Sequence, residues 1–263
     1  MDESNYAVGP IKARAAVTVD FGLPAELPLN ELAPVIERDR QHMAKRPGMR
    51  SKHLPFRIDS TSGNYLSGGR YLFDSLENAE RYKSWAGNEF VLDGFKFFER
   101  PFFLDAVCHV WSVIGAHDFA DIHSAHTVIR SERWQLRSGR KHDFVQCWSE
   151  IYREAEKRNL ASVWLLENGP EELAGIVSIT GGVAPAAASQ SINAGLEAVE
   201  SAAPLGTMFE RLGWTKVFDR TSWVLTIWFP ITEGQADVAP LWPNSPPLPG
   251  PRYALSTRSP GLA

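Results

Sequence analysis

The sequence has few cysteines and no long apolar segment. Its two cysteines, Cys108 and Cys147, provide neither a disulfide framework nor the spacing of a metal site. No apolar run approaches the roughly 20 residues that a membrane-spanning helix needs. The acidic start, residues 1–4, lacks the charged-then-apolar order of a secretory signal. These absences predict a cytoplasmic protein that does not bind membranes.

Neither sign of charge dominates the chain. It has 31 acidic and 27 basic residues, a net charge of −4, and no long basic block, so nucleic acid is not an expected partner. Gly181-Gly182 does not fit a dinucleotide fingerprint, and no Walker pattern exists, so nucleotide cofactors are not expected either.

Histidines leave two further cofactor questions. In a helix, His123 and His126 would lie on one face and could bind the same metal ion. No third ligand has a matching spacing, so a solvated linker between the halves is the favoured interpretation. None of the seven histidines belongs to a haem-attachment motif. We therefore predict no metal and no cofactor, with haem kept as an alternative that an absorbance spectrum would test.

Aromatic residues, by contrast, are abundant. The chain has nine Trp and 14 Phe, and aromatics make up 11% of it. Such residues fill protein cores, but they also line pockets for flat apolar ligands.

One short passage occurs twice. Residues 96–103 and 216–223 share the pattern Lys-x-Phe-acid-Arg-x-x-aromatic, and the copies start 216 − 96 = 120 residues apart, about the size of one small domain. We interpret the passage as the entrance to the last strand of each half, with Glu99/Arg100 and Asp219/Arg220 in structural roles.

The hydrophobic periodicity repeats the same order of elements in both halves. The first half predicts strands at 11–21, 49–58, 65–73 and 95–114 and helices at 29–46 and 76–87, the latter capped by Asp74 or Ser75. The second half predicts strands at 126–136, 161–167, 173–180 and 222–229 and helices at 143–158 and 189–202. The domains expected are 1–116 and 117–232, followed by a Pro-rich tail over 233–263.

This order describes an α+β fold of two tandem ferredoxin-like (βαββαβ) units. Each unit has a four-stranded antiparallel sheet with helices on one face, which leaves the other face apolar and uncovered. We expect the two sheets to pack face to face as an α/β barrel, with a cleft inside each half.

Residues 67–85 carry a Gly-Gly-x-Tyr-Leu-Phe strand that passes into an acidic helix with Ala and Tyr. This pattern resembles the YdhR-type monooxygenases of the dimeric α/β barrel superfamily, and the similarity extends more loosely over residues 11–113. The resemblance implies a barrel of two ferredoxin-like units. The superfamily includes cofactor-free monooxygenases, cyclases, isomerases, lyases and some haem proteins. No catalytic motif carries over, so the resemblance implies the fold rather than the reaction.

Candidate site residues come from polar or titratable side chains in predicted strands. On the strand 126–136 neither face is cleanly apolar: one face carries Arg130, Glu132 and Trp134, and the other carries Thr127, Ile129, Ser131, Arg133 and Gln135. Arg130 would pair with Glu132 or hold a substrate anion, or else the strand is a charged edge strand. The other candidates are His53, His109 and Tyr65 as catalytic groups, and Arg57, Trp111, Phe56 and Tyr71, with Trp134, as substrate-binding groups.

These features together predict an enzyme that binds a small apolar, aromatic substrate in a Trp- and Phe-lined cleft. Cofactor-independent monooxygenation is the first hypothesis; a lyase, isomerase or cyclase, and a binding protein without catalysis, are the alternatives. A homodimer is left open as a further partner. A histidine bonded to an acid or Tyr in a closed cleft would favour catalysis, whereas a barrel filled by side chains would argue against an enzyme.

Overall fold

The computed structural model describes residues 8–27, 39, 42, 46–120, 127–136, 144–183 and 194–228. Most of the predicted helix 29–46, the segment with His123 and His126, and the tail 233–263 lie outside the described residues. The predicted domain boundaries remain a prediction.

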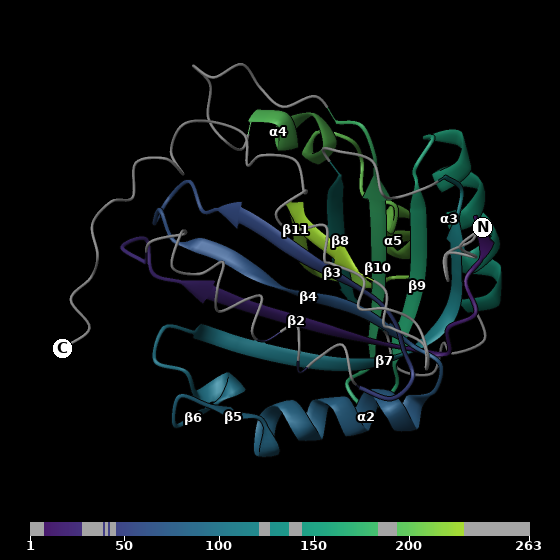
Figure 1. Cartoon of the computed structure of the whole chain (residues 1–263). Coiled ribbons are helices and arrows are strands. Elements are labelled where there is room, and N and C mark those ends of the chain that lie inside the picture. Colours follow the sequence, from purple (N-terminus) through teal and green to yellow (C-terminus); the bar gives the residue numbers. More distant parts are fainter. Residues whose placement is uncertain are drawn as a thin grey trace, which may run out of the picture.

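Eight long antiparallel strands form a closed barrel (Figure 1). The strands are β2 (Ala15–Leu23), β3 (Met49–Ile58), β4 (Tyr65–Phe73), β7 (Leu104–Asp118), β8 (Val128–Gln135), β9 (Ser162–Asn168), β10 (Leu173–Thr180) and β11 (Thr215–Trp228). They follow the order β7-β2-β4-β3-β11-β8-β10-β9, and β9 pairs with β7 to close the ring. The short strand β1 (Gly9–Pro10) adds to β7, and β5 (Val91–Leu92) pairs with β6 (Phe95–Lys96) in a separate hairpin.

The barrel consists of two ferredoxin-like units, as predicted. The first has the strand order β7-β2-β4-β3 and the second the equivalent order β11-β8-β10-β9. The units join through the pairs β3–β11 and β7–β9. The two sheets therefore enclose one shared interior, which differs from the expected cleft in each half.

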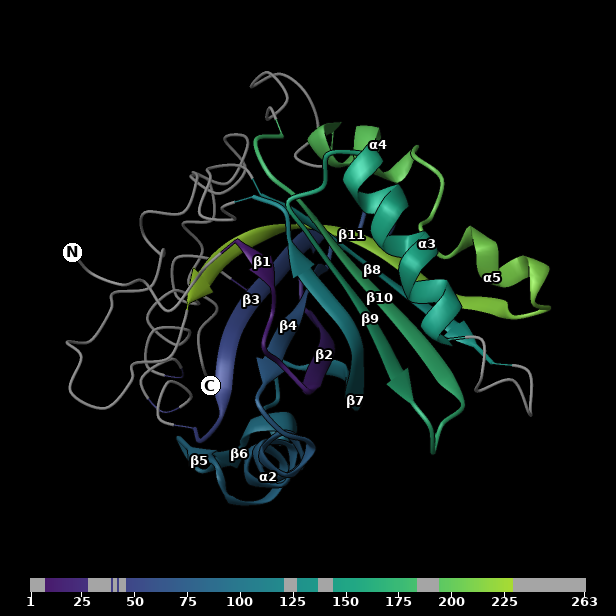
Figure 2. The ribbon, with the colours of Figure 1, turned by 90° about the vertical axis from the view of Figure 1, so that its right-hand side faces the viewer.

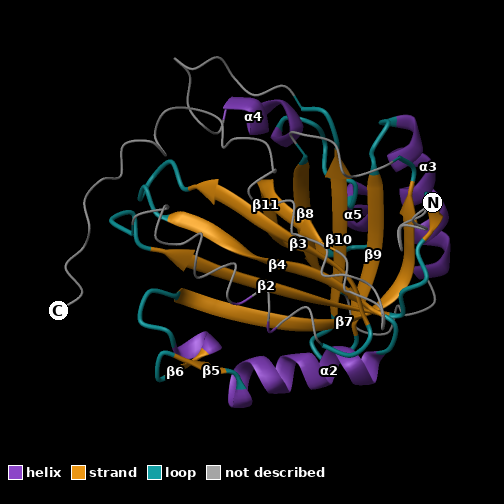
Figure 3. Ribbon diagram, in the orientation of Figure 1, coloured by secondary structure: helices purple, strands orange, loops and turns teal. Residues whose placement is uncertain are grey.

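Helices lie outside this strand wall, as Figures 2 and 3 show. Helix α2 (Leu76–Ser84) packs on the first unit, and α3 (Phe144–Lys157), α4 (Ala194–Glu200) and α5 (Thr207–Arg211) lie on the second. Of the two predicted caps of α2, Ser75 is the one observed, and its Oγ accepts a hydrogen bond from the Asn78 amide at 3.2 Å. A π-helical turn, Trp85–Glu89, extends α2.

The two copies of the repeated passage adopt different structures. The first copy passes from β6 into a 3₁₀ turn, Phe97–Glu99, so β7 begins at Leu104 and not at residue 95. The second copy lies inside β11, which begins at Thr215 and not at residue 222. The passage is therefore the entrance to the last strand only in the first half. Helix α5 was not predicted.

Alternation along the strands separates two kinds of core. Outward side chains of β2 and β4, such as Val17 and Phe73, pack with α2 residues such as Tyr82. Inward side chains form an apolar cluster in one part of the barrel, including Trp111, Trp164, Leu166, Ile129, Ile179 and Val224. Polar inward side chains of β2, β4, β8 and β11 form the candidate site.

Candidate functional site

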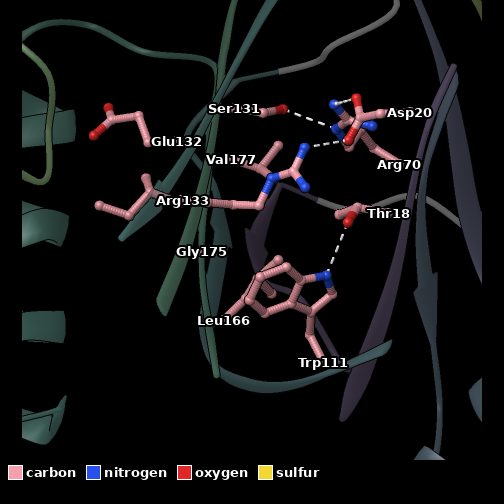
Figure 4. Close-up of a pocket in the computed structure, with 11 residues that line it drawn as sticks. Thr18, Asp20, Arg70, Trp111, Ser131, Glu132, Arg133, Leu166, Gly175 and Val177 are labelled. Atoms are coloured by element: carbon pink, nitrogen blue, oxygen red, sulfur yellow. Dashed lines mark hydrogen bonds and ion pairs between the residues drawn. The ribbon is translucent and has the colours of Figure 1, made fainter. Parts of the chain in front are cut away.

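Three arginines converge on one carboxylate inside the barrel. Asp20 on β2 accepts from Arg70 Nη2 at 2.7 Å through Oδ1 and from Arg133 Nη2 at 2.5 Å through Oδ2. Arg220 of β11 also donates to Oδ1. Figure 4 shows Asp20, Arg70 and Arg133 pointing toward one another from opposite walls. We call Asp20, Arg70, Arg133 and Arg220 the arginine cluster.

The register of the strands explains why these residues meet. Ser131 lies opposite Arg220 in the β8–β11 pair, so the two side chains share the inner face. Arg70 crosses the interior from β4 and donates through Nε to Ser131 Oγ at 2.8 Å. Arg70 Nη1 also donates to the Val19 carbonyl at 2.7 Å, which fixes the guanidinium against the wall.

Glycine allows β2 and β4 to approach closely beside Arg70. Gly68 has a φ of +154°, and a Cβ there would lie 1.9 Å from the Val19 carbonyl oxygen. A Cβ at Gly69 would collide with the Tyr71 ring, at 2.1 Å. The Gly-Gly pair thus lets Tyr71 and Arg70 take their places on opposite faces of β4.

His109 of β7 adds a titratable group to the arginine cluster. Its Nε2 lies 2.8 Å from Arg133 Nη1, and its Nδ1 lies 2.6 Å from Glu171 Oε2. An arginine can only donate, so Nε2 accepts and Nδ1–H donates to Glu171. This arrangement is the neutral imidazole with its proton on Nδ1.

Burial and charge support that assignment. Burial, and then the nearby Arg133 guanidinium, lower the pKa of His109 below its ordinary value. Burial also lowers the pKa of each of the three clustered arginines to about 10. All three remain protonated at pH 7, so three positive charges face the single negative charge of Asp20.

Little free space lies directly beside the arginine cluster. A cavity of about 10 Å³ is lined by Asp20, Arg70 and Arg133 of the arginine cluster, by Thr18 and by the Trp111 ring, and about one water molecule would fill it. The Trp111 indole donates to Thr18 Oγ1 at 2.9 Å. This part of the interior is therefore closely packed by side chains. A substrate must meet the arginine cluster from its solvent side, where Arg133 and Arg220 are 13% and 11% exposed.

Of the predicted site residues, His109 and Trp111 lie together in the interior, with ring centroids 5.4 Å apart. His53 also points inward but packs edge-on against Trp164, with ring centroids 5.3 Å apart, in the apolar part of the barrel.

Arg130, Glu132 and Trp134 lie on the outer face of β8. Arg130 does not pair with Glu132; it forms a two-bond ion pair with Asp219 at 2.8 and 2.9 Å. Glu132 accepts from the amides of Leu205 and Gly206 and from the Trp134 indole, at 2.8 to 3.1 Å. In Figure 4 the Glu132 side chain points away from the arginine cluster. The strand is paired on both sides, so the alternative of a charged edge strand is wrong.

The other predicted site residues are also outside this cluster. Tyr65 donates to the Ala25 carbonyl at 3.2 Å, and its ring packs at a tilt against Phe56 in a separate apolar group. Tyr71 packs against Tyr82 under α2, and burial raises the pKa of its phenol. Arg57 pairs with Glu200 and donates to the Thr221 carbonyl.

The sequence interpretation missed Asp20, Arg70, Arg133 and Arg220. A signal existed for Asp20, the only charge in the apolar strand AAVTVDFGL. Arg220 was assigned a structural role, as was Arg100. That role holds for Arg100, which forms a two-bond ion pair with Asp39 at 2.6 and 2.9 Å. Arg220 instead enters the barrel and donates to Asp20.

The described residues provide neither a metal-binding group nor a membrane-spanning helix. Among them, no three His, Cys, Asp or Glu side chains are grouped closely enough to bind a metal ion. No helix in the described part of the chain has both the length and the apolar character required to cross a bilayer.

No family model and no curated protein matches the chain. Solved structures do match. A protein of Fusobacterium nucleatum named "putative monooxygenase" shares 11% identity at a TM-score of 0.55, over 87% of this chain and 99% of its own. A Lactobacillus acidophilus protein of the same name shares 8% identity at a TM-score of 0.51, over 82% and 97%. An "anthrone oxidase-like protein" shares 11% at a TM-score of 0.51, over 85% and 97%. The chain thus has the dimeric α/β barrel fold, built in a single polypeptide.

Proposed function

We propose that the chain is a small-molecule enzyme that removes a proton from an apolar, aromatic substrate at the arginine cluster. The observation that supports this best is His109, a neutral imidazole oriented by Glu171 and placed 2.8 Å from a guanidinium. A histidine held by an acid beside fixed positive charge can act as a general base and stabilise the anion it creates.

The proton transfer follows from the hydrogen bonds at His109. Its Nε2 lone pair accepts from Arg133 Nη1, so a substrate must displace that N–H to reach the base. Once displaced, Arg133 can donate to the oxygen on which negative charge develops. The substrate is therefore a carbon acid whose anion is an enolate or phenolate, with the oxygen facing Arg133.

Cofactor-independent monooxygenation is the reaction we propose for this anion. With anthrone as the example, the enolate reacts with O₂; the ring CH₂ becomes C=O, one oxygen atom enters the product and the other leaves as water. The protein supplies proton transfer and anion stabilisation, and O₂ is the oxidant. The name of the anthrone oxidase-like neighbour motivates this choice of substrate.

Oxygen uptake with anthrone tests the proposal. We expect substrate-dependent uptake by the wild type and a loss of at least about 100-fold in His109→Gln, a typical contribution of a general base. His117→Gln is the matched control, because His117 lies on the same strand but packs against Tyr152 of α3. Wild-type protein without uptake, or a fully active His109→Gln variant, would contradict the proposal.

Two other functions remain as alternatives. A lyase, isomerase or cyclase would use the same proton transfer without O₂, so turnover under anaerobic conditions would identify it. Binding without catalysis would use the same partly exposed arginines, Arg133 and Arg220, without proton transfer. Saturable ligand binding with no proton exchange at the acidic carbon would identify that function.

A further inference from the structure

Among the residues that the structure describes, positive charge is in excess at the arginine cluster. Arg70, Arg133 and Arg220 contribute three positive charges, and Asp20 contributes one negative charge. Glu171 at the rim reduces the excess of two to one, but its side chain is 42% exposed and therefore well solvated. Uncompensated buried charge is costly, so the cluster has a reason to attract an anion.

The three guanidinium groups differ in how many of their N–H groups are still available to donate hydrogen bonds to a ligand. Arg70 is only 2% exposed, and Ser131, Asp20 and two carbonyl groups accept its hydrogen bonds. Arg220 donates only to Asp20 among the described residues. Arg133 donates to Asp20 and His109 there and leaves its Nε unused. The available donors therefore lie on Arg133 and Arg220, on the solvent side of Asp20.

An aromatic ring holds these two cations side by side. The Arg133 guanidinium lies 3.8 Å from the centre of the Phe218 ring, and that of Arg220 lies 5.0 Å from it. Contact with the face of a ring offsets part of the repulsion between like charges. Phe218 thus helps to keep two forked donors next to each other.

Apolar surface continues from the same end of the barrel. Val107 pairs with Asp20 across β7 and β2, so it shares the inner face with the arginine cluster, and it is 43% exposed. A ligand bound to Arg133 and Arg220 would place its body against Val107 and Phe218. A planar apolar body with a forked anion matches both surfaces.

We propose that Arg220 and Arg133 bind the carboxylate of an aromatic acid. This inference rests on the proposed function only where it makes the aromatic acid a substrate. Binding of the acid can be measured whether or not the protein converts it. The cavity behind the cluster holds about one water, so the carboxylate lies on the solvent side and does not displace Asp20.

Calorimetric titration with benzoate tests the site directly. We expect saturable binding of benzoate, no binding of the neutral analogue benzamide, and at least tenfold weaker benzoate binding by Arg220→Gln. Arg220→Lys keeps the positive charge but loses the forked pair of donors, so its benzoate affinity should lie between those of the wild type and Arg220→Gln. Arg130→Gln is the matched control: it changes an arginine on the outer face of β8, and it should leave the affinity within twofold of the wild type.

The outcomes separate this inference from the proposed function. Benzoate binding without any oxygen uptake from anthrone supports the carboxylate site and contradicts the enzyme. Oxygen uptake with no preference for benzoate over benzamide contradicts the carboxylate site alone. Equal benzoate affinity in folded Arg220→Gln and wild type would also overturn the site, as would inorganic phosphate binding more tightly than benzoate. Far-UV circular dichroism establishes that each variant is folded.

Discussion

At the scale of single residues, two arginines on β8 show that the face of the strand on which a side chain lies determines its role. Arg130 points outward and forms a two-bond ion pair with Asp219. Arg133 points inward and joins the arginine cluster. Side chains three positions apart on a strand point to opposite faces of the sheet. Arg130 therefore has a structural role outside the barrel, whereas Arg133 belongs to the candidate site inside it.

The titration of His109 is a first prediction at this scale. Burial and Arg133 disfavour the imidazolium, so the ring should titrate below its ordinary pKa and be neutral at pH 7. Arg133→Gln removes the positive neighbour and should raise the His109 pKa. Ring-proton NMR titration measures both values, with Arg130→Gln as the control that leaves the His109 pKa unchanged. An unchanged pKa in Arg133→Gln would contradict the assigned contact.

If His109 is the base, activity must follow the same titration. The imidazole accepts a proton only when neutral, so the rate should fall as the pH drops through the His109 pKa. Because that pKa lies below the ordinary value, the wild type should keep its rate to a lower pH than Arg133→Gln does. If the pH–rate profiles of the wild type and Arg133→Gln coincide, the titration of His109 does not control the rate, and His109 is not the base.

Gly68 gives a second prediction. An alanine there would combine a φ of +154° with a Cβ 1.9 Å from the Val19 carbonyl oxygen. We expect Gly68→Ala to lower the free energy of unfolding by about 3 kcal/mol or more. Gly94→Ala is the matched control, since Gly94 has a φ of +84° but nothing within 4 Å of a Cβ, and about 1 kcal/mol is expected. Urea unfolding that gives equal losses would show that the close approach to β2 does not matter.

At the scale of elements, Glu132 attaches a loop to the barrel. Its carboxylate accepts from the Leu205 and Gly206 amides just before α5 and from the Trp134 indole. Glu132→Ala leaves these buried donors without acceptors, so we expect a loss of about 3 kcal/mol in the free energy of unfolding. Glu132→Gln keeps an acceptor oxygen and should lose less.

Hydrogen exchange gives the local readout for this third prediction. The Leu205 and Gly206 amides should exchange much faster in Glu132→Ala than in the wild type, while amides in β4 change only with global stability. Unchanged protection at both amides would mean that something other than Glu132 holds the loop.

The elements themselves were largely predictable from the sequence. The strands 49–58, 65–73 and 173–180 match β3, β4 and β10, because dense apolar and β-branched runs between turn residues specify them locally. The start of β7 was not predictable in this way. Its preceding segment is equally rich in Phe, but the side chains pack under α2 in a hairpin and a 3₁₀ turn.

At the scale of the whole molecule, the barrel links the two units by two strand pairs, β3–β11 and β7–β9. Each unit therefore buries its inner face only against the other. We expect a single cooperative unfolding transition, with far-UV circular dichroism and tryptophan fluorescence giving the same midpoint in urea. Two separated transitions would show that one unit is stable by itself.

The candidate site could be predicted only in part, for a reason that belongs to this scale. His109 and Trp111 were found because histidine and tryptophan together on one strand face are informative locally. Asp20, Arg133 and Arg220 lie more than 80 residues apart along the chain, and only closure of the barrel brings them to one point. Since β8 is polar on both faces, no local pattern distinguishes Arg133 from Arg130.

The joining of both units in one chain has a consequence for how the interior can change. In a barrel made of two identical subunits, every substitution would appear twice, on both walls. Here Asp20, Arg70 and His109 come from the first unit, and Arg133 and Arg220 from the second. Each wall can therefore accumulate mutations independently, and one end of the barrel can gain charge while the other keeps its packed tryptophans.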